Sequence, residues 1–156
     1  MSILRDLERL RGLTALERSF LISAVLLLPA VGLGLRMIGF GRLHAALHRS
    51  AITPVEKATS DVAMKTALAV SRMVSIAARR GLYRANCLPT SLALAHLLGK
   101  LGIATDLRVG VRKVAGVFEA HAWVELQGQP LNDDHDVHDR FPAFNQPIDP
   151  SKRASD

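Results

Sequence analysis

The sequence predicts an α+β fold, in which a helical N-terminal region precedes a Cys-bearing helix packed on a small antiparallel sheet. Up to residue 98, apolar residues recur at the spacing of about 3.6 residues that one helix face requires. After residue 106 the pattern changes to an alternation of apolar and polar residues, which is typical of strands. Between these two regions stands the single cysteine, Cys87, just before a proline and an apolar helical pattern.

Composition limits the size and the partners of the protein. The chain has 156 residues, of which 49% are hydrophobic, so one domain with a helical extension can bury a core. One cysteine cannot form an internal disulfide, so no oxidising compartment is implied and we expect a cytoplasmic protein. The net charge of +6 favours acidic partners, but zinc-finger spacing, a basic aromatic groove and a phosphate-binding Gly loop are all missing from the sequence. Nucleic acid is therefore not an expected partner.

The N-terminal region predicts two helices. Leucines at near-helical spacing, separated by charged residues, indicate a first helix from Met1 to Arg18. Thr14 and Glu17 form a capping-box pattern for a second helix, which Pro29 is expected to kink or end.

The apolar run from Phe20 to Leu35 allows more than one interpretation. It is about sixteen residues long, shorter than the roughly 18–20 residues of a spanning helix, and it contains proline and glycine. No signal-peptide cleavage pattern follows it. We expect a helix that is buried or faces a partner; a peripheral or inserted membrane segment is the alternative.

A basic connection, Arg42 to Thr53, and one clear helix precede the cysteine in this interpretation. His44 and His48 have the i, i+4 spacing of zinc ligands, but no third ligand lies in a matching motif, so a solvated helix face is expected and no metal. A helix from Asp61 to Arg80 is clearer, because four apolar residues form a core-facing stripe. These residues are Val70, Met73, Val74 and Ala77.

Cys87 lies at the start of the next predicted helix. This helix should begin near Leu88 or Pro89 and end at Gly99 or Gly102. The free amides and the dipole of a helix N-terminus favour a thiolate. A small buried hydrophobic residue is the alternative interpretation of a lone cysteine.

Three strands are expected after that helix. The first contains residues 107–111, and the second runs from Val117 to Leu126 with His121, Trp123 and Glu125 on one face. A third strand, Pro130 to Asp133, follows a hairpin turn. If the turn is the three-residue segment 127–129, Asp133 shares the face of His121; if it is the two-residue segment 127–128, Asp134 does.

A cysteine, a histidine and an aspartate in this order can perform acyl transfer. The imidazole takes the thiol proton and later gives it to the leaving amine. The carboxylate fixes the imidazole tautomer and stabilises the imidazolium. The backbone N–H of Cys87, at the helix start, is the candidate oxyanion donor.

Four motifs in the stretch 84–133 carry a family resemblance. They are CLP (87–89), LGI (101–103), RVGVR (108–112) and HAWVE (121–125). With them the chain resembles the lasso-peptide leader peptidases, a bacterial branch of the transglutaminase-like superfamily with a papain-like core. The resemblance divides the chain into three parts: a helical region for core packing or partner docking (1–56), a transglutaminase-like cysteine protease core (57–140) and a polar C-terminal tail (141–156).

The resemblance implies a function and assigns roles to residues. The family's members are cysteine proteases that remove the leader from a ribosomally made lasso precursor peptide, so that a separate ATP-dependent, asparagine-synthetase-like cyclase can form the isopeptide ring. By position, Cys87 would be the nucleophile, His121 the base and Asp133, rather than Asp134, the orienting carboxylate. No cofactor is expected.

The N-terminal region departs from some relatives, which carry a fused leader-binding module with an open strand edge. Here this region has a helical pattern, so we expect a separate leader-recognition protein (a RiPP recognition element). The helix from Phe20 to Leu35 would then be core, a dock for a partner, or a membrane contact. Alternative functions are another thiol acyltransferase or amidase of the same fold, and a non-catalytic peptide-binding member.

Overall fold

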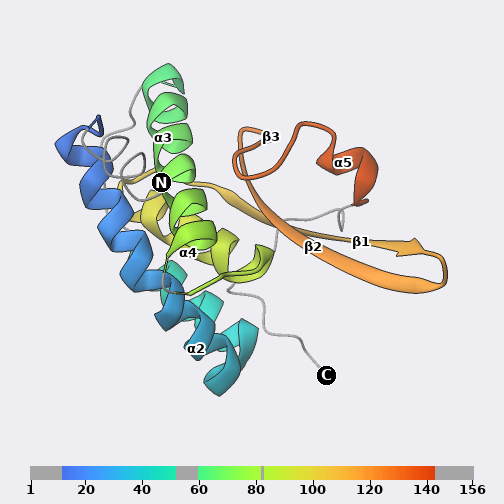
Figure 1. The fold of residues 1–156 in the computed structure, drawn as a ribbon. Helices are drawn as coiled ribbons and strands as arrows, with labels where there is room; N and C mark the ends of the chain where they lie inside the picture. The colour runs from blue at the N-terminus through green and yellow to red at the C-terminus, as the bar shows by residue number, and fades with distance from the viewer. Residues whose placement is uncertain (1–11, 52–59, 82, 143–156) are drawn as a thin grey trace, which may run out of the picture.

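The computed structural model describes residues 12–51, 60–81 and 83–142, and it confirms the predicted α+β fold. Its elements in chain order are α2 (Ala15–Ala51), α3 (Ser60–Arg80), α4 (Cys87–Lys100), β1 (Asp106–Val114), β2 (Val117–Leu126), β3 (Gln129–Pro130) and α5 (Val137–Arg140). The three long helices lie together, and the β1–β2 hairpin extends away from them with α5 beside it (Figure 1). Residues 1–11, most of the first predicted helix, lie outside the described residues.

Helix α2 begins at the predicted capping box but does not end where expected. The Glu17 amide donates to Thr14 Oγ1 at 3.2 Å, and the Thr14 amide donates to Glu17 Oε2 at 2.9 Å. An end of the helix at Pro29, one of the two predicted outcomes, was wrong, because the helix continues past Pro29 and its break lies at Gly39 (φ 76°, ψ 170°). A proline inside a helix costs about 3 kcal/mol, which burial of the flanking Leu28 and Val31 offsets.

The break at Gly39 folds the end of α2 back on itself. A Cβ added at Gly34 would lie 2.9 Å from Leu43 Cδ1, although nine residues of straight helix would separate the two by about 13 Å. The positive φ at Gly39 belongs to the left-handed region, which glycine adopts without steric cost. A glycine, rather than the proline, therefore makes the turn in this helix.

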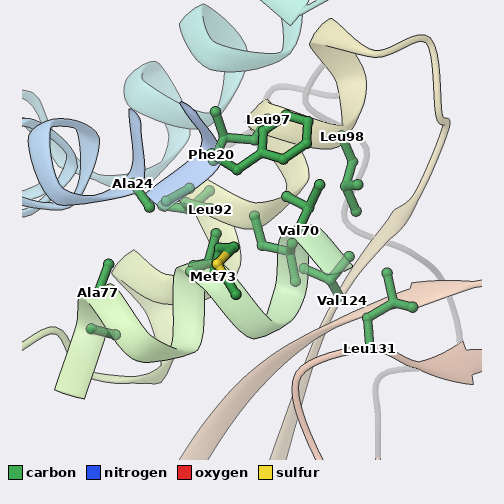
Figure 2. Close-up of a cluster of buried hydrophobic side chains, with 14 of the residues drawn as sticks. Phe20, Ala24, Val70, Met73, Ala77, Leu92, Leu97, Leu98, Val124 and Leu131 are labelled. Atoms are coloured by element: carbon green, nitrogen blue, oxygen red, sulfur yellow. The ribbon is translucent and has the colours of Figure 1, made fainter. Parts of the chain in front are cut away.

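Helix α2 has one buried and one exposed apolar face. Phe20, Ala24, Leu28 and Val31 belong to the hydrophobic core, where Phe20 and Ala24 lie near Leu92 of α4 (Figure 2). The opposite face exposes the apolar side chains of Ile22, Leu26, Leu33 and Met37, which we call the outer face of α2. By length and composition, residues 15–50 could cross a membrane, but core helices pass the same test.

Helix α3 carries the predicted core stripe. Val70, Met73, Val74 and Ala77 are at most 2% exposed and lie in the core, and Figure 2 shows Val70, Met73 and Ala77 there. This confirms the periodicity argument, since residues spaced by three and four positions share one helix face.

The prediction that His44 and His48 lie on a solvated helix face was right for His48 and wrong for His44. His48 is exposed, but His44 is buried and stacks on Phe40 with 5.2 Å between ring centroids. The bend at Gly39 turns His44 inward, which the sequence spacing did not indicate. Within the described parts of the chain, no group of three or more His, Cys, Asp or Glu side chains could hold a metal ion.

The sheet is antiparallel in the order β1-β2-β3, and its last strand is short. Gln127 (φ 54°) and Gly128 (φ 79°) form a two-residue turn, and Leu126 pairs with Gln129. The predicted third strand from Pro130 to Asp133 was wrong beyond Pro130. After the Leu131 amide bonds to Val124 O at 2.8 Å, the Leu131 carbonyl instead accepts a hydrogen bond from Ser71 of α3 at 2.7 Å.

Candidate active site

Cys87 is the first residue of α4 and is partly exposed. The helix begins one residue earlier than the predicted Leu88. Asn86 is the N-cap residue, with extended backbone (φ −76°, ψ 179°), and its side chain makes no capping hydrogen bond to this helix end. Its carbonyl accepts hydrogen bonds from the Thr90 amide at 3.2 Å and the Thr90 hydroxyl at 2.8 Å. The cysteine therefore lies at an electropositive helix end whose first amides the Asn86 side chain does not use.

His121 and Asp133 are in direct contact. His121 lies on β2, and its Nε2 forms a hydrogen bond with Asp133 Oδ2. The other carboxylate oxygen accepts the backbone N–H of Asp134 at 2.9 Å and the guanidinium of Arg140 at 2.5 Å. Asp133 thus has partners on both oxygens, as expected of a carboxylate held in one orientation.

These contacts keep Asp133 ionised. Partial burial raises the pKa of Asp133, but the hydrogen bonds from His121, the Asp134 amide and Arg140 outweigh burial and leave the pKa below its ordinary value. An ionised carboxylate can only accept hydrogen bonds, so His121 Nε2 carries a proton toward it. In the neutral form of the imidazole, Nδ1 is then the nitrogen with a free lone pair, which can act as a base.

The contact of His121 with Asp133 does not follow from the hairpin argument. The turn is the two-residue form, for which strand alternation placed Asp134 on the face of His121. Such alternation requires a strand through residue 133, whereas β3 ends at Pro130. Beyond Leu131 the chain leaves the ladder, so strand alternation no longer determines where Asp133 and Asp134 point.

Aromatic rings surround the His121 imidazole. The Phe141 ring centroid lies 4.9 Å away and that of Trp123 6.1 Å away. Gly110 faces His121 across the β1–β2 ladder, and a Cβ there would lie 2.8 Å from Phe141 O. Glycine at this position therefore allows Phe141 to approach the imidazole.

Sequence reasoning missed Arg140 and Phe141. The sequence places Phe141 in the predicted polar tail, and Arg140 lies at the end of the short helix α5. One signal was available for the helix: Asp136 and Arg140 have the i, i+4 spacing of a helical ion pair, and they form one at 3.0 Å. No sequence signal indicated that Arg140 also reaches Asp133.

The comparisons with known proteins show the family of this chain. The family model described as "Transglutaminase-like superfamily" matches residues 27–145, a range that includes Cys87, His121 and Asp133. The chain therefore belongs to the transglutaminase-like superfamily. The microcin J25-processing protein McjB of Escherichia coli is 34% identical to it over 68 residues, which are 44% of this chain and 32% of that protein. The chain thus matches about a third of the length of this relative, and no solved structure matches it.

Proposed function

We propose that this protein is a cysteine peptidase that removes the leader from a ribosomally made lasso precursor peptide. The observation that carries the proposal is the His121–Asp133 pair, which leaves imidazole Nδ1 free for a thiol. Cys87, partly exposed at the start of α4, supplies that thiol in the proposal. Similarity to a microcin J25-processing protein supports lasso precursors as the substrate class, since microcin J25 is a lasso peptide.

In the proposed reaction, His121 Nδ1 takes the proton of the Cys87 thiol. The thiolate attacks the carbonyl carbon of the scissile peptide bond, and the backbone N–H of Cys87 donates to the resulting oxyanion. The imidazolium gives its proton to the leaving amine, which departs as the N-terminus of the core peptide. Water then attacks the thioester, His121 takes a proton from that water, and the leader acid and the Cys87 thiol are released. Asp133 stabilises the imidazolium throughout.

The proposal includes two protein partners. A separate leader-recognition protein holds the leader near the peptidase, and an ATP-dependent cyclase receives the released core peptide. The outer face of α2 is the proposed contact surface for these partners or for a membrane, because Ile22, Leu26 and Met37 are each more than half exposed. We place the protein in the cytoplasm, where precursor peptides are made.

Cleavage of a full-length precursor tests this function. The purified protein should release leader and core slowly alone and faster when the leader-recognition protein is added, because the partner raises the effective concentration of substrate. The products are identified by mass spectrometry at low and moderate salt. Their masses distinguish hydrolysis of the peptide bond between leader and core from the reaction of an acyltransferase or of another amidase. Full-speed cleavage without any partner would contradict the split arrangement, and an intact precursor in every mixture would contradict the peptidase.

A further inference from the structure

Ser91 connects the helix of Cys87 to the strand of His121. It lies one turn after Cys87 on α4, about 6 Å along the helix axis, and is fully buried. Its hydroxyl donates to the carbonyl oxygen of Ala122 at 3.0 Å. Ala122 is the residue after His121, so this hydrogen bond joins the first turns of α4 to the backbone beside the imidazole.

Asn132 joins the same network from the segment that carries Asp133. Its Nδ2 donates to Ser91 Oγ at 2.9 Å, and its Oδ1 accepts the backbone N–H of Val124 at 2.8 Å. The side chain thereby takes the place of a ladder bond on β2 at the point where β3 has ended. Because Asn132 directly precedes Asp133, three hydrogen bonds link the segments that carry all three proposed catalytic residues.

The chemistry of this network restricts the residues that can form it. A serine hydroxyl can donate one hydrogen bond and accept others, and here it does both. The amide of Asn132 also uses its donor and its acceptor at once. The bond between Asn132 Nδ2 and Ser91 Oγ forms only while both side chains keep their positions, and a buried polar group without a partner is costly.

Apolar packing alone would hold these segments less precisely. Leu92 and Leu131, the neighbours in sequence of Ser91 and Asn132, lie with Val124 in the shared core (Figure 2). Such contacts are non-directional and allow small shifts of a helix along a sheet. Hydrogen bonds depend on distance and angle, so they can fix the position of α4 relative to β2.

We propose that Ser91 and Asn132 form a clasp that positions the Cys87 thiol for proton transfer to His121. The inference rests on the proposed peptidase function and adds two positioning residues, which touch neither substrate nor thiol. The thiol and the imidazole must have the right distance and orientation for the ion pair to form. A misplacement of about 1 Å can lower a rate roughly 100-fold.

The first test measures the thiol without any substrate. The rate of Cys87 alkylation by iodoacetamide is followed against pH in the full chain. A cysteine paired with His121 reacts well below the pH at which a free thiol does, because the ion pair supplies thiolate there. Ser91→Ala and Asn132→Ala should lose this low-pH reaction, and Val70→Ala, which removes buried apolar atoms of the core, should keep it.

The second test separates positioning from stability during precursor cleavage. Ser91→Ala and Asn132→Ala should each lower kcat roughly 100-fold and leave KM within about twofold, and the double variant should be no worse than either single one. Unfolding curves are recorded to check that the variants are folded. If Ser91→Ala does not fold, the test relies on Asn132→Ala, because Asn132 is only partly buried.

The outcomes separate the clasp from the function on which it rests. If the wild type alkylates at low pH and both clasp variants do so equally well, the clasp is overturned and the Cys–His pair stands. If the wild type itself shows only free-thiol behaviour, the proposed ion pair is overturned, whatever the clasp variants do. Loss of the low-pH reaction in Val70→Ala as well would show that any weakening of the fold has this effect, which also overturns the clasp.

Discussion

Two regions of this protein are held together by different forces: the three long helices α2, α3 and α4, which we call the helical half, and the segments around His121, which we call the site half. Helices α2, α3 and α4 share one apolar cluster, in which Phe20, Met73 and Leu92 are buried together (Figure 2). Around His121, by contrast, directional bonds are added to aromatic packing, namely the contacts of Asp133 with the imidazole and with Arg140. Apolar burial depends on area and tolerates small shifts, whereas hydrogen-bonded pairs depend on geometry. Substitutions in the two halves should therefore affect different properties.

The largest expected effect is on activity, from loss of the proposed nucleophile or base. Cys87→Ala and His121→Ala should each lower the rate of leader removal by on the order of 10⁴-fold or more, because members of a catalytic unit act together. Thermal unfolding of Cys87→Ala should hardly change, since one partly exposed sulfur is lost at a helix end. The measurement is precursor cleavage with equal amounts of folded protein; cleavage by Cys87→Ala at the wild-type rate would exclude the thiol mechanism.

Two adjacent aspartates give a matched comparison within the site half. Asp133→Asn should lower kcat roughly 100-fold or more, because an amide can present a hydrogen-bond donor to His121 and so favour the wrong tautomer. Asp134→Asn should change kcat less than about twofold, since the described contact of Asp134 with Asp133 uses only its backbone N–H. Both variants are assayed on the same precursor. The reverse order of effects would transfer the orienting role to Asp134.

Two leucines of α2 give the matched comparison within the helical half. Leu28 is 1% exposed and Leu26 70% exposed. Leu28→Ala should therefore lower the free energy of unfolding by about 2–5 kcal/mol, and Leu26→Ala by less than about 0.5 kcal/mol. At a temperature where both are folded, neither should alter kcat of the isolated protein. Denaturant unfolding measures the first effect, and a similar loss of stability from both substitutions would show that the outer face of α2 is covered.

The smallest expected effect is the contribution of Asp133 to the free energy of unfolding, which should depend on pH. The folded-state pKa of Asp133 is below its ordinary value of 3.8, so its interactions stabilise the fold above that pH and are lost as pH falls through the lower folded-state pKa. The stability difference between wild type and Asp133→Asn should therefore be largest near neutral pH and shrink below about pH 4. Urea unfolding at a series of pH values measures it. A difference that grows as the pH falls would mean that the pKa is raised.

Sequence patterns predicted elements well where neighbouring residues decide the outcome. The capping box at Thr14 and the apolar stripe of α3 both form as expected. Local arguments failed where burial overrode them, as at Pro29, which α2 passes without ending, and at His44, which the bend at Gly39 turns inward. In both cases packing against distant residues outweighed a preference of the local chain.

The sequence by itself determined that a cysteine begins a helix and that a histidine lies on an alternating strand, because these features depend on residues a few positions apart. Only the tertiary structure decided which carboxylate meets His121. The two-residue hairpin turn pointed to Asp134, but β3 ends at Pro130, and the following residues bond to Ser71, Val124 and Ser91 instead of continuing the ladder. Those partners lie in other elements, so the path that brings Asp133 and Arg140 together depends on how distant segments pack and not on any local period.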